Sequence, residues 1–270
     1  MRLTTMFGVG AAAAALLAGC VGLMPPVPSL GTEGDVPGTG ATEAVTGFAL
    51  VSNGVATADE FREDLEAFEG VEVIEDGLGP LYNAQSCREC HQDPISGGGS
   101  QVAELRAGVR DAQGRFRAPR VPIAHGQAVI EGRTLINDRA ICPNAAFPNE
   151  QIHERVPDEA NVRAFRMSLN LLGDGLIEAV ADPALRDLAA RQCRETQGRI
   201  CGLVIDVPVL EAPGQMRPGR FGWKSQQASL LSFAADAYLN EMGITSRLLT
   251  EDVTTVCDTV ADPEDRPETA

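Results

Sequence analysis

The chain has 270 residues, of which 44% are apolar, enough for one large or two small domains with a hydrophobic core. Its formal net charge of −16 at pH 7 argues against binding to nucleic acid or to acidic lipid head groups, and would suit a basic partner protein. Aromatic residues are scarce at 4%, and Trp223 is the only tryptophan.

The N-terminus resembles a bacterial lipoprotein signal. A basic start and an Ala-rich apolar run over residues 7–17, too short for a stable membrane anchor, precede a small-residue stretch that ends at Cys20. We therefore expect residues 1–19 to be removed and Cys20 to carry the lipid. An ordinary secretory signal with a chance cysteine is the alternative, and in either case the mature chain is exported. Val21 favours the outer membrane by resemblance to sorted lipoproteins.

Composition then divides the mature chain into three parts. Residues 20–50 are rich in Pro, Gly, Thr and Ser and have no apolar periodicity, as is typical of a flexible tether. Residues 51–260 hold the periodic apolar patterns and are expected to fold as one domain. Residues 261–270 are polar and are expected to form a disordered tail.

Helical signals dominate the folded part. Thr57 and Glu60 form a capping box before apolar residues at helical spacing, and Gly70 ends that helix. Further helices are expected at 158–172, from Asp182 to near Gly198, and at 225–242, with one short strand at 203–210. Prolines make 100–148 irregular. The patterns predict a mainly α protein with long irregular loops and a short β segment.

The run Cys87-Arg88-Glu89-Cys90-His91 is typical of a c-type haem attachment site. In a helical turn the two thiols lie on one side, where both can form thioethers to one porphyrin. The imidazole of His91 then ligates the iron from the proximal side. We therefore predict one covalently attached haem c, with Cys87, Cys90 and His91 as its binding residues, and residues 51–260 as a cytochrome c-like haem domain.

Two other uses of this run were weighed. A dithiol redox pair does not require the adjacent histidine and usually opens a helix of a βαβ unit, which the sequence does not indicate. A zinc site needs a second pair of ligands at similar spacing, and His125 and Cys142 are isolated.

Four further cysteines remain once Cys20 and the haem pair are assigned. In an oxidising compartment four cysteines suggest two disulfides, for which three connectivities exist. Cys193 and Cys201 would close a short loop and are the preferred pair. Cys142 with Cys257 then follows by elimination.

Four segments resemble the bacterial di-haem oxidoreductase family, whose members are often labelled thiol oxidoreductases and are related to the di-haem cytochrome c peroxidases. They are residues 77–83 (GLGPLYN) leading into the haem run, 172–179 (LGDGLIEA), 219–224 (GRFGWK) and 240–245 (NEMGIT). Family members normally carry a second half with another Cys-x-x-Cys-His, whereas this sequence holds one. The resemblance thus covers the first-haem half, and it puts peroxidase activity of this chain by itself in question.

The iron also needs a sixth ligand or an open site. Met242 is the first choice, because a thioether ligand raises the potential as electron transfer requires, although a methionine on an apolar stripe is more often part of a core. His125 is the second choice. His153, in a charged stretch, is expected to be solvated, and Met167 and Met216 are less suited.

Several other residues were considered for roles beside the haem. Trp223 could relay electrons or simply anchor packing. Lys224, Arg220 and Arg217 could pair with the haem propionates or form a solvated basic loop. Glu178 could act as acid or base at an open iron, or be a satisfied structural carboxylate.

The sequence therefore predicts an exported, lipid-anchored c-type cytochrome that passes electrons to a redox partner protein or a second haem domain. The first alternative is a peroxidase or thiol oxidoreductase at an open haem iron, completed by a second haem domain. The second is a non-catalytic surface lipoprotein.

Overall fold

The computed structural model of the chain describes residues 47–259. The expected signal peptide with Cys20, most of the tether and the expected tail at 261–270 lie outside the described residues. None of the helices within 47–259 is both long and apolar enough to cross a membrane.

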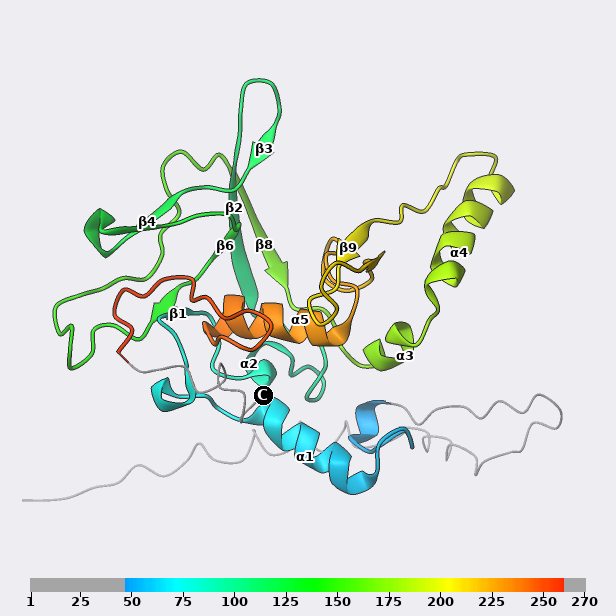
Figure 1. The fold of residues 1–270 in the computed structure, drawn as a ribbon, viewed down its shortest axis with the longest axis horizontal. Coiled ribbons are helices and arrows are strands. Elements are labelled where there is room, and N and C mark those ends of the chain that lie inside the picture. Colours follow the sequence, from blue (N-terminus) through cyan, green and yellow to red (C-terminus); the bar gives the residue numbers. More distant parts are fainter. Residues whose placement is uncertain (1–46, 260–270) are drawn as a thin grey trace, which may run out of the picture. The chain divides into compact units, whose positions relative to one another are not determined.

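The prediction of a mainly α protein is wrong. Residues 47–259 are 26% helical and 19% strand, and the strands form several small antiparallel sheets (Figure 1). The difference lies chiefly in residues 100–148, where short strands form despite the prolines, one of which, Pro122, lies within a strand. Strands of this length gain their stability from pairing with distant segments, which local sequence patterns do not reveal.

The helices are α1 (Ala58–Glu69), α2 (Cys87–Cys90), α3 (Asp174–Glu178), α4 (Asp182–Glu195) and α5 (Leu230–Ala237), with short turns η1 (Gly47–Ala49), η2 (Ile74–Asp76), η3 (Ala124–Gly126) and the π-helical η4 (Tyr238–Met242). The strands are β1 (Leu81–Tyr82), β2 (Ala103–Arg110), β3 (Phe116–Arg117), β4 (Val121–Ile123), β5 (Ala128–Ile130), β6 (Leu135–Ile136), β7 (Arg139–Ala140), β8 (Val162–Met167), β9 (Asp206–Pro208) and β10 (Met216–Pro218).

The longest strand, β2, organises the largest sheet. It pairs antiparallel with β6 and with β8, so that Leu105 faces Ile136 on one side and Phe165 on the other, and it pairs with β3 near its end (Figure 1). The prediction of a helix at 158–172 is therefore wrong, because this segment contains the edge strand β8. Its apolar residues fit helical spacing and strand alternation alike, and the pairing with β2 decides between them.

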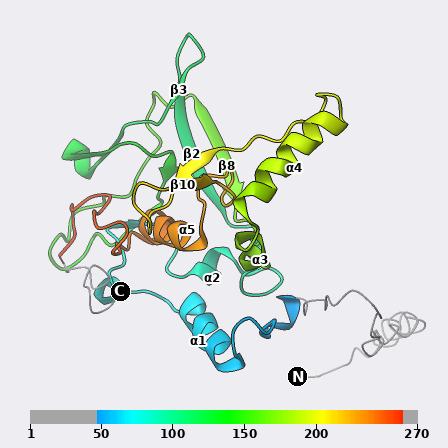
Figure 2. The same cartoon turned by 45° about the vertical axis from the view of Figure 1, so that its right-hand side comes forward.

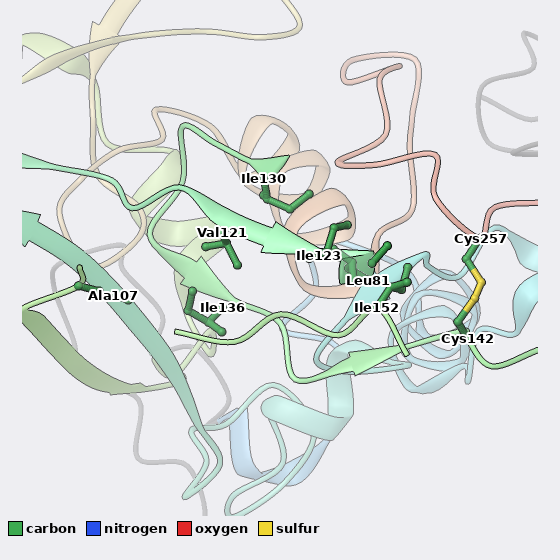
Figure 3. Packing of buried hydrophobic residues seen from close by; sticks show 11 residues of the cluster. Leu81, Ala107, Val121, Ile123, Ile130, Ile136, Cys142, Ile152 and Cys257 are labelled. Carbon is green, nitrogen blue, oxygen red and sulfur yellow. A yellow bond between two sulfur atoms is a disulfide. The ribbon is translucent and has the colours of Figure 1, made fainter. Parts of the chain in front are cut away.

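The main hydrophobic core lies between β1, β4, β5, β6 and the C-terminal segment. Its buried side chains include Leu81, Val121, Ile123 and Ile152, and the disulfide between Cys142 and Cys257 closes its edge (Figure 3). Both expected disulfides are confirmed, since Cys193 in α4 is bonded to Cys201. Each cross-link restricts the unfolded chain and so favours the folded state.

Three of the expected helices form, with different accuracy. At the start of α1 the Thr57 hydroxyl accepts a hydrogen bond from the Glu60 backbone N–H, and the Glu60 carboxylate accepts one from the Thr57 N–H, which confirms the capping box. Helix α4 starts at Asp182 as expected. Helix α5 starts only at Leu230, capped by Ser229, so the expected helix at 225–242 is too long at its N-terminal end. Figure 2 shows α3 near α5, and β10, which pairs with β9 and contacts α4.

Candidate functional site

The segment that leads into the cysteine run is fixed against the end of η4. The backbone N–H of Gly79 donates to the Met242 carbonyl at 3.0 Å, and that of Asn83 donates to the Glu241 carbonyl at 2.6 Å. Gly243 has a φ of 72°, and a β-carbon there would lie 2.6 Å from the Gly79 oxygen. Glycine is therefore required at this crossing, and two segments of the family resemblance, 77–83 and 240–245, are brought together.

The two cysteines of the run lie at the ends of the single turn α2. The Ser86 hydroxyl accepts a hydrogen bond from the Glu89 N–H at 3.2 Å and so caps this turn. Cys87 and Cys90 are half-buried and are the free cysteines of the described chain. Every other cysteine within residues 47–259 is in a disulfide.

Both thiols are held in their protonated form. Burial raises the pKa of Cys87, and burial followed by the nearby carboxylates of Glu241, Glu89 and Glu104 raises the pKa of Cys90 to about 11. A dithiol redox centre depends on a thiolate with a depressed pKa, which this environment opposes. The surroundings of the cysteines thus disfavour thiol–disulfide exchange.

His91 follows α2 directly, and its ring is oriented by a backbone carbonyl. Its Nδ1 lies 3.3 Å from the Gly98 oxygen, and because a carbonyl can only accept, Nδ1 carries the proton. In the neutral ring this leaves Nε2 unprotonated, and a backbone carbonyl on Nδ1 is the arrangement typical of metal-ligating histidines. Burial lowers the pKa of His91, opposed by the carbonyls of Gly98 and Leu169, which favours the neutral form that binds iron.

The glycines after the cysteine run hold this carbonyl in place. A β-carbon on Gly98 would lie 2.0 Å from the Asp93 oxygen, so only glycine fits. The Leu171 N–H donates to the Gly97 carbonyl at 2.8 Å, which ties the loop to the chain that follows β8. The orientation of His91 is therefore supported by two separate segments.

Beside Cys90 lies an acidic cluster that the sequence did not predict. Glu104 and Arg106, two apart on β2, form a bidentate ion pair, and Arg106 Nη2 also lies 3.5 Å from Glu241 Oε1. Asn83 Nδ2 donates to Glu241 Oε2 at 2.9 Å. Burial and the adjacent Glu104 raise the pKa of Glu241 to about 8. The one sequence signal for this cluster is the spacing of Glu104 and Arg106, which lie two residues apart and therefore share a face once 103–110 is known to be a strand.

The structure places Met242 in an apolar cluster with Leu78 and Ile244, where its side chain is buried. This is the packing expected of a core methionine, and its ligation to iron stays a prediction. His125 is exposed in the turn η3 with a φ of 54°, and His153 is half-buried. Met167 on β8 and Met216 on β10 are both exposed.

The arginines considered as propionate partners are already engaged. Arg217 and Arg220 both pair with Asp182 at the start of α4, and Arg220 Nη1 also donates to the Val180 carbonyl at 2.6 Å. These contacts bring together the second and third segments of the family resemblance, 172–179 and 219–224, since Arg220 also reaches the carbonyls of Ile177 and Glu178. Lys224 is exposed.

Two other considered residues have defined structural contacts. Glu178 Oε1 accepts a hydrogen bond from the Leu230 N–H at 3.1 Å and so caps α5, which agrees with the structural alternative. Trp223 is half exposed, its indole N–H donates to the Met167 carbonyl at 3.1 Å, and the Arg166 guanidinium lies over its ring. It anchors the end of β8.

Within residues 47–259, no group of three or more His, Cys, Asp or Glu side chains is arranged to hold a metal ion by itself. Comparison of the chain with family models, with curated proteins and with solved structures finds no match.

Proposed function

We propose that this chain is a c-type cytochrome that carries electrons through one haem attached to Cys87 and Cys90, with His91 as the proximal iron ligand. One observation carries the proposal. Two free thiols stand at the ends of a single helical turn, and the next residue presents an imidazole whose Nδ1 is held by a carbonyl. This donor set fits a haem, because thioether attachment takes two thiols and iron takes one neutral imidazole nitrogen.

The chain's own groups have distinct tasks in this proposal. Bound haem supplies one-electron chemistry at its iron, while the protein sets position and electronics. Cys87 and Cys90 fix the edge of the macrocycle relative to α2. The Gly98 carbonyl keeps His91 in one tautomer and one orientation and makes its Nε2 more basic. Met242 remains the proposed sixth ligand, for which its side chain would have to leave the cluster with Leu78 and Ile244.

The resemblance to the di-haem oxidoreductase family enters as part of the proposal. The contacts between segments 77–83 and 240–245, and between 172–179 and 219–224, support it, because segments that act together in one site are expected to meet in the fold. The partner would be a redox protein or a second haem domain. An open iron would instead favour peroxidase or thiol-oxidising chemistry.

We further propose export and attachment to the membrane through a lipid on Cys20, on the periplasmic side of the cell envelope. The two disulfides support export, because disulfides persist in oxidising compartments. Replacing Cys20 with Ser should release the protein from the membrane fraction into the periplasm. Unchanged membrane retention of that variant would reject the anchor.

The haem itself is tested by expressing the full chain together with the c-type haem attachment machinery. The purified protein should keep one haem per chain after denaturation, seen as colour that stays with the polypeptide on a denaturing gel. The variant C87S/C90S should be colourless. The matched control C193S/C201S also removes two cysteines and should keep its haem. A colourless wild type made under these conditions would reject the proposal.

The state of the iron decides between electron transfer and the enzymatic alternative. A six-coordinate low-spin spectrum of the reduced protein, lost in Met242→Ala and kept in Met216→Ala, would favour electron transfer through a His/Met iron. A high-spin spectrum with turnover of hydrogen peroxide or of a thiol would favour the peroxidase or thiol oxidoreductase.

A further inference from the structure

One strand of the largest sheet exposes an apolar stripe that a strand of this sheet would ordinarily bury. Phe165, Met167 and Leu169 are 72%, 55% and 43% exposed. Side chains two residues apart in an extended chain point to the same face, so these three form one stripe along β8 and the residues that follow it. Contiguous large apolar side chains at a surface mark a site that another group covers.

The stripe leads to the imidazole of His91. Beyond β8, the Leu171 N–H donates to the Gly97 carbonyl at 2.8 Å, and the next residue, Gly98, holds Nδ1 of His91. A β-carbon on Gly99 would lie 3.6 Å from the Ser168 oxygen, so the backbone between Met167 and Leu169 lies beside the loop that holds the ring. The segment that carries the stripe and the loop that orients the proposed iron ligand therefore lie side by side.

The hollow next to α2 fits a macrocycle less well. Its lining is largely charged or polar, with Glu69, Gln85, Arg88, Glu89 and Gln92. The stripe, by contrast, is apolar over a length of about 13 Å between residues 165 and 169, comparable with the diameter of a porphyrin. A porphyrin has two broad apolar faces, and removing them from water together with the stripe is favourable.

We propose that the stripe of Phe165, Met167 and Leu169 is the surface against which the porphyrin lies once it is attached to α2. This inference rests on the proposed function. It adds β8, an element that is not part of the Cys-x-x-Cys-His run, to the haem site, and it gives Met167 a role as a contact of the macrocycle.

The chain provides an internal control for this inference. Met167 and Met216 are both 55% exposed in the polypeptide, and both lie on strands. Oxidation of methionine to the sulfoxide follows exposure. In the haem-bearing full chain treated with chloramine-T, mass spectrometry should show Met167 oxidised at least about tenfold more slowly than Met216. Equal rates in a coloured protein would overturn the inference and leave the proposed function standing.

The same treatment of protein made without the attachment machinery separates the porphyrin from other covers. Without haem the two methionines should be oxidised at equal rates. Protection of Met167 in that protein would show that a second copy or another protein covers the stripe, and would overturn the inference. A colourless preparation from the attachment host would instead reject the proposed function.

A third readout does not depend on the haem-free protein being folded. Phe165→Ser in the haem-bearing chain should shift the position of the Soret band, because it replaces an apolar contact of the macrocycle with a polar one. Phe116→Ser, on the exposed strand β3, is the matched control and should leave the band in place. Identical spectra for both variants and the wild type would overturn the inference.

Discussion

Two carboxylate sites contact neighbouring residues of η4 and differ in the number of positive charges available to each carboxylate. In the Glu154 pair, the buried carboxylate of Glu154 contacts the Arg133 guanidinium and accepts the Asn137 N–H, and Asn137 Nδ2 donates to the Asn240 carbonyl. In the Glu241 cluster, Glu241 and Glu104 share the single guanidinium of Arg106. Asn240 and Glu241 are neighbours in η4, so the two sites meet at this one turn.

The difference shows how the number of partners decides what a buried carboxylate does. Burial raises the pKa of Glu154, and the full charge of Arg133 opposes that shift. For Glu241 the opposing effects of Arg106 and Asn83 are outweighed by burial and by Glu104, and the pKa reaches about 8. Burial thus raises the pKa at both sites, but Glu154 has one guanidinium to itself, whereas Glu241 shares one with a second carboxylate and changes its proton content near neutral pH.

The largest effect on stability is expected from breaking the ion pair between Arg133 and Glu154. Arg133→Met leaves a buried carboxylate without its cation and should lower the free energy of unfolding at pH 7 by about 3–5 kcal/mol, measured by urea denaturation. The double variant R133M/E154Q keeps an acceptor for the Asn137 N–H but removes the charge, and should recover at least half of the loss. A loss below about 1 kcal/mol in R133M would show that the pair is solvated.

Glu241→Gln sharpens the comparison, because its effect should have the opposite sign. The pKa of Glu241 in the folded chain, about 8, lies above the ordinary value of 4.5. Between these values the folded chain binds more protons than the unfolded chain, so stability falls as the pH rises through this window. The variant lacks this pH-dependent loss of stability. Its free energy of unfolding should exceed that of the wild type by on the order of 2 kcal/mol at pH 9 and should equal it at pH 4.

The matched change Glu154→Gln removes a carboxylate whose pKa burial also raises, so the variant should gain stability at pH 9 relative to pH 4, but by less than Glu241→Gln, because Arg133 opposes the shift. Urea denaturation of both variants at pH 4, 6 and 9 checks the pair of predictions. A gain for E154Q at pH 9 as large as that for E241Q would contradict the distinction between the two sites.

A smaller effect is expected from the hydrogen bond that opposes the Glu241 shift. Asn83→Ala removes the hydrogen-bond donor to Glu241. It should lower the free energy of unfolding by about 1 kcal/mol at pH 9, where that carboxylate is charged, and by less at pH 4. Asn161 makes two hydrogen bonds to the backbone of Arg110 on the exposed surface, so Asn161→Ala is the control and should show no dependence on pH. A pH-independent loss in N83A would contradict the prediction.

The smallest effect concerns the thiol next to the cluster. In protein made without haem, E104Q/E241Q should lower the pKa of Cys90 from about 11 by on the order of half a unit, because two nearby negative charges are removed. The rate of alkylation by iodoacetamide as a function of pH, with the site identified by mass spectrometry, measures this shift. Glu154→Gln should leave the profile unchanged, and a shift of the same size in that control would point to a general loosening of the fold.

Signals that act over a few residues were predictable. The capping box of Thr57 and Glu60 and the start of α4 at Asp182 depend only on nearby backbone groups. Both disulfides followed from counting cysteines, with the short loop from Cys193 to Cys201 as the guide. The haem run was visible for the same reason, since all of its functional residues lie within five positions.

Contacts between distant segments were not predictable. The apolar residues of 158–172 suit a helix, yet they form β8 because β2 offers six residues of antiparallel pairing. The helix expected from Ser225 starts later, because the backbone of Gln227 pairs with Phe221 and Ser225 has a φ of 51°. In both cases a tertiary partner outweighs the local propensity.

The sequence by itself determined the two thiols and the imidazole, the helix caps and the cysteine pairing, because the interactions concerned are covalent or span a few residues. Only the tertiary structure decided that Glu104 meets Glu241, that Gly98 orients His91, and that the chain after β8 lies beside the loop holding that ring. Burial and charge balance depend on which distant segments meet, and a linear pattern of residues holds no measure of either.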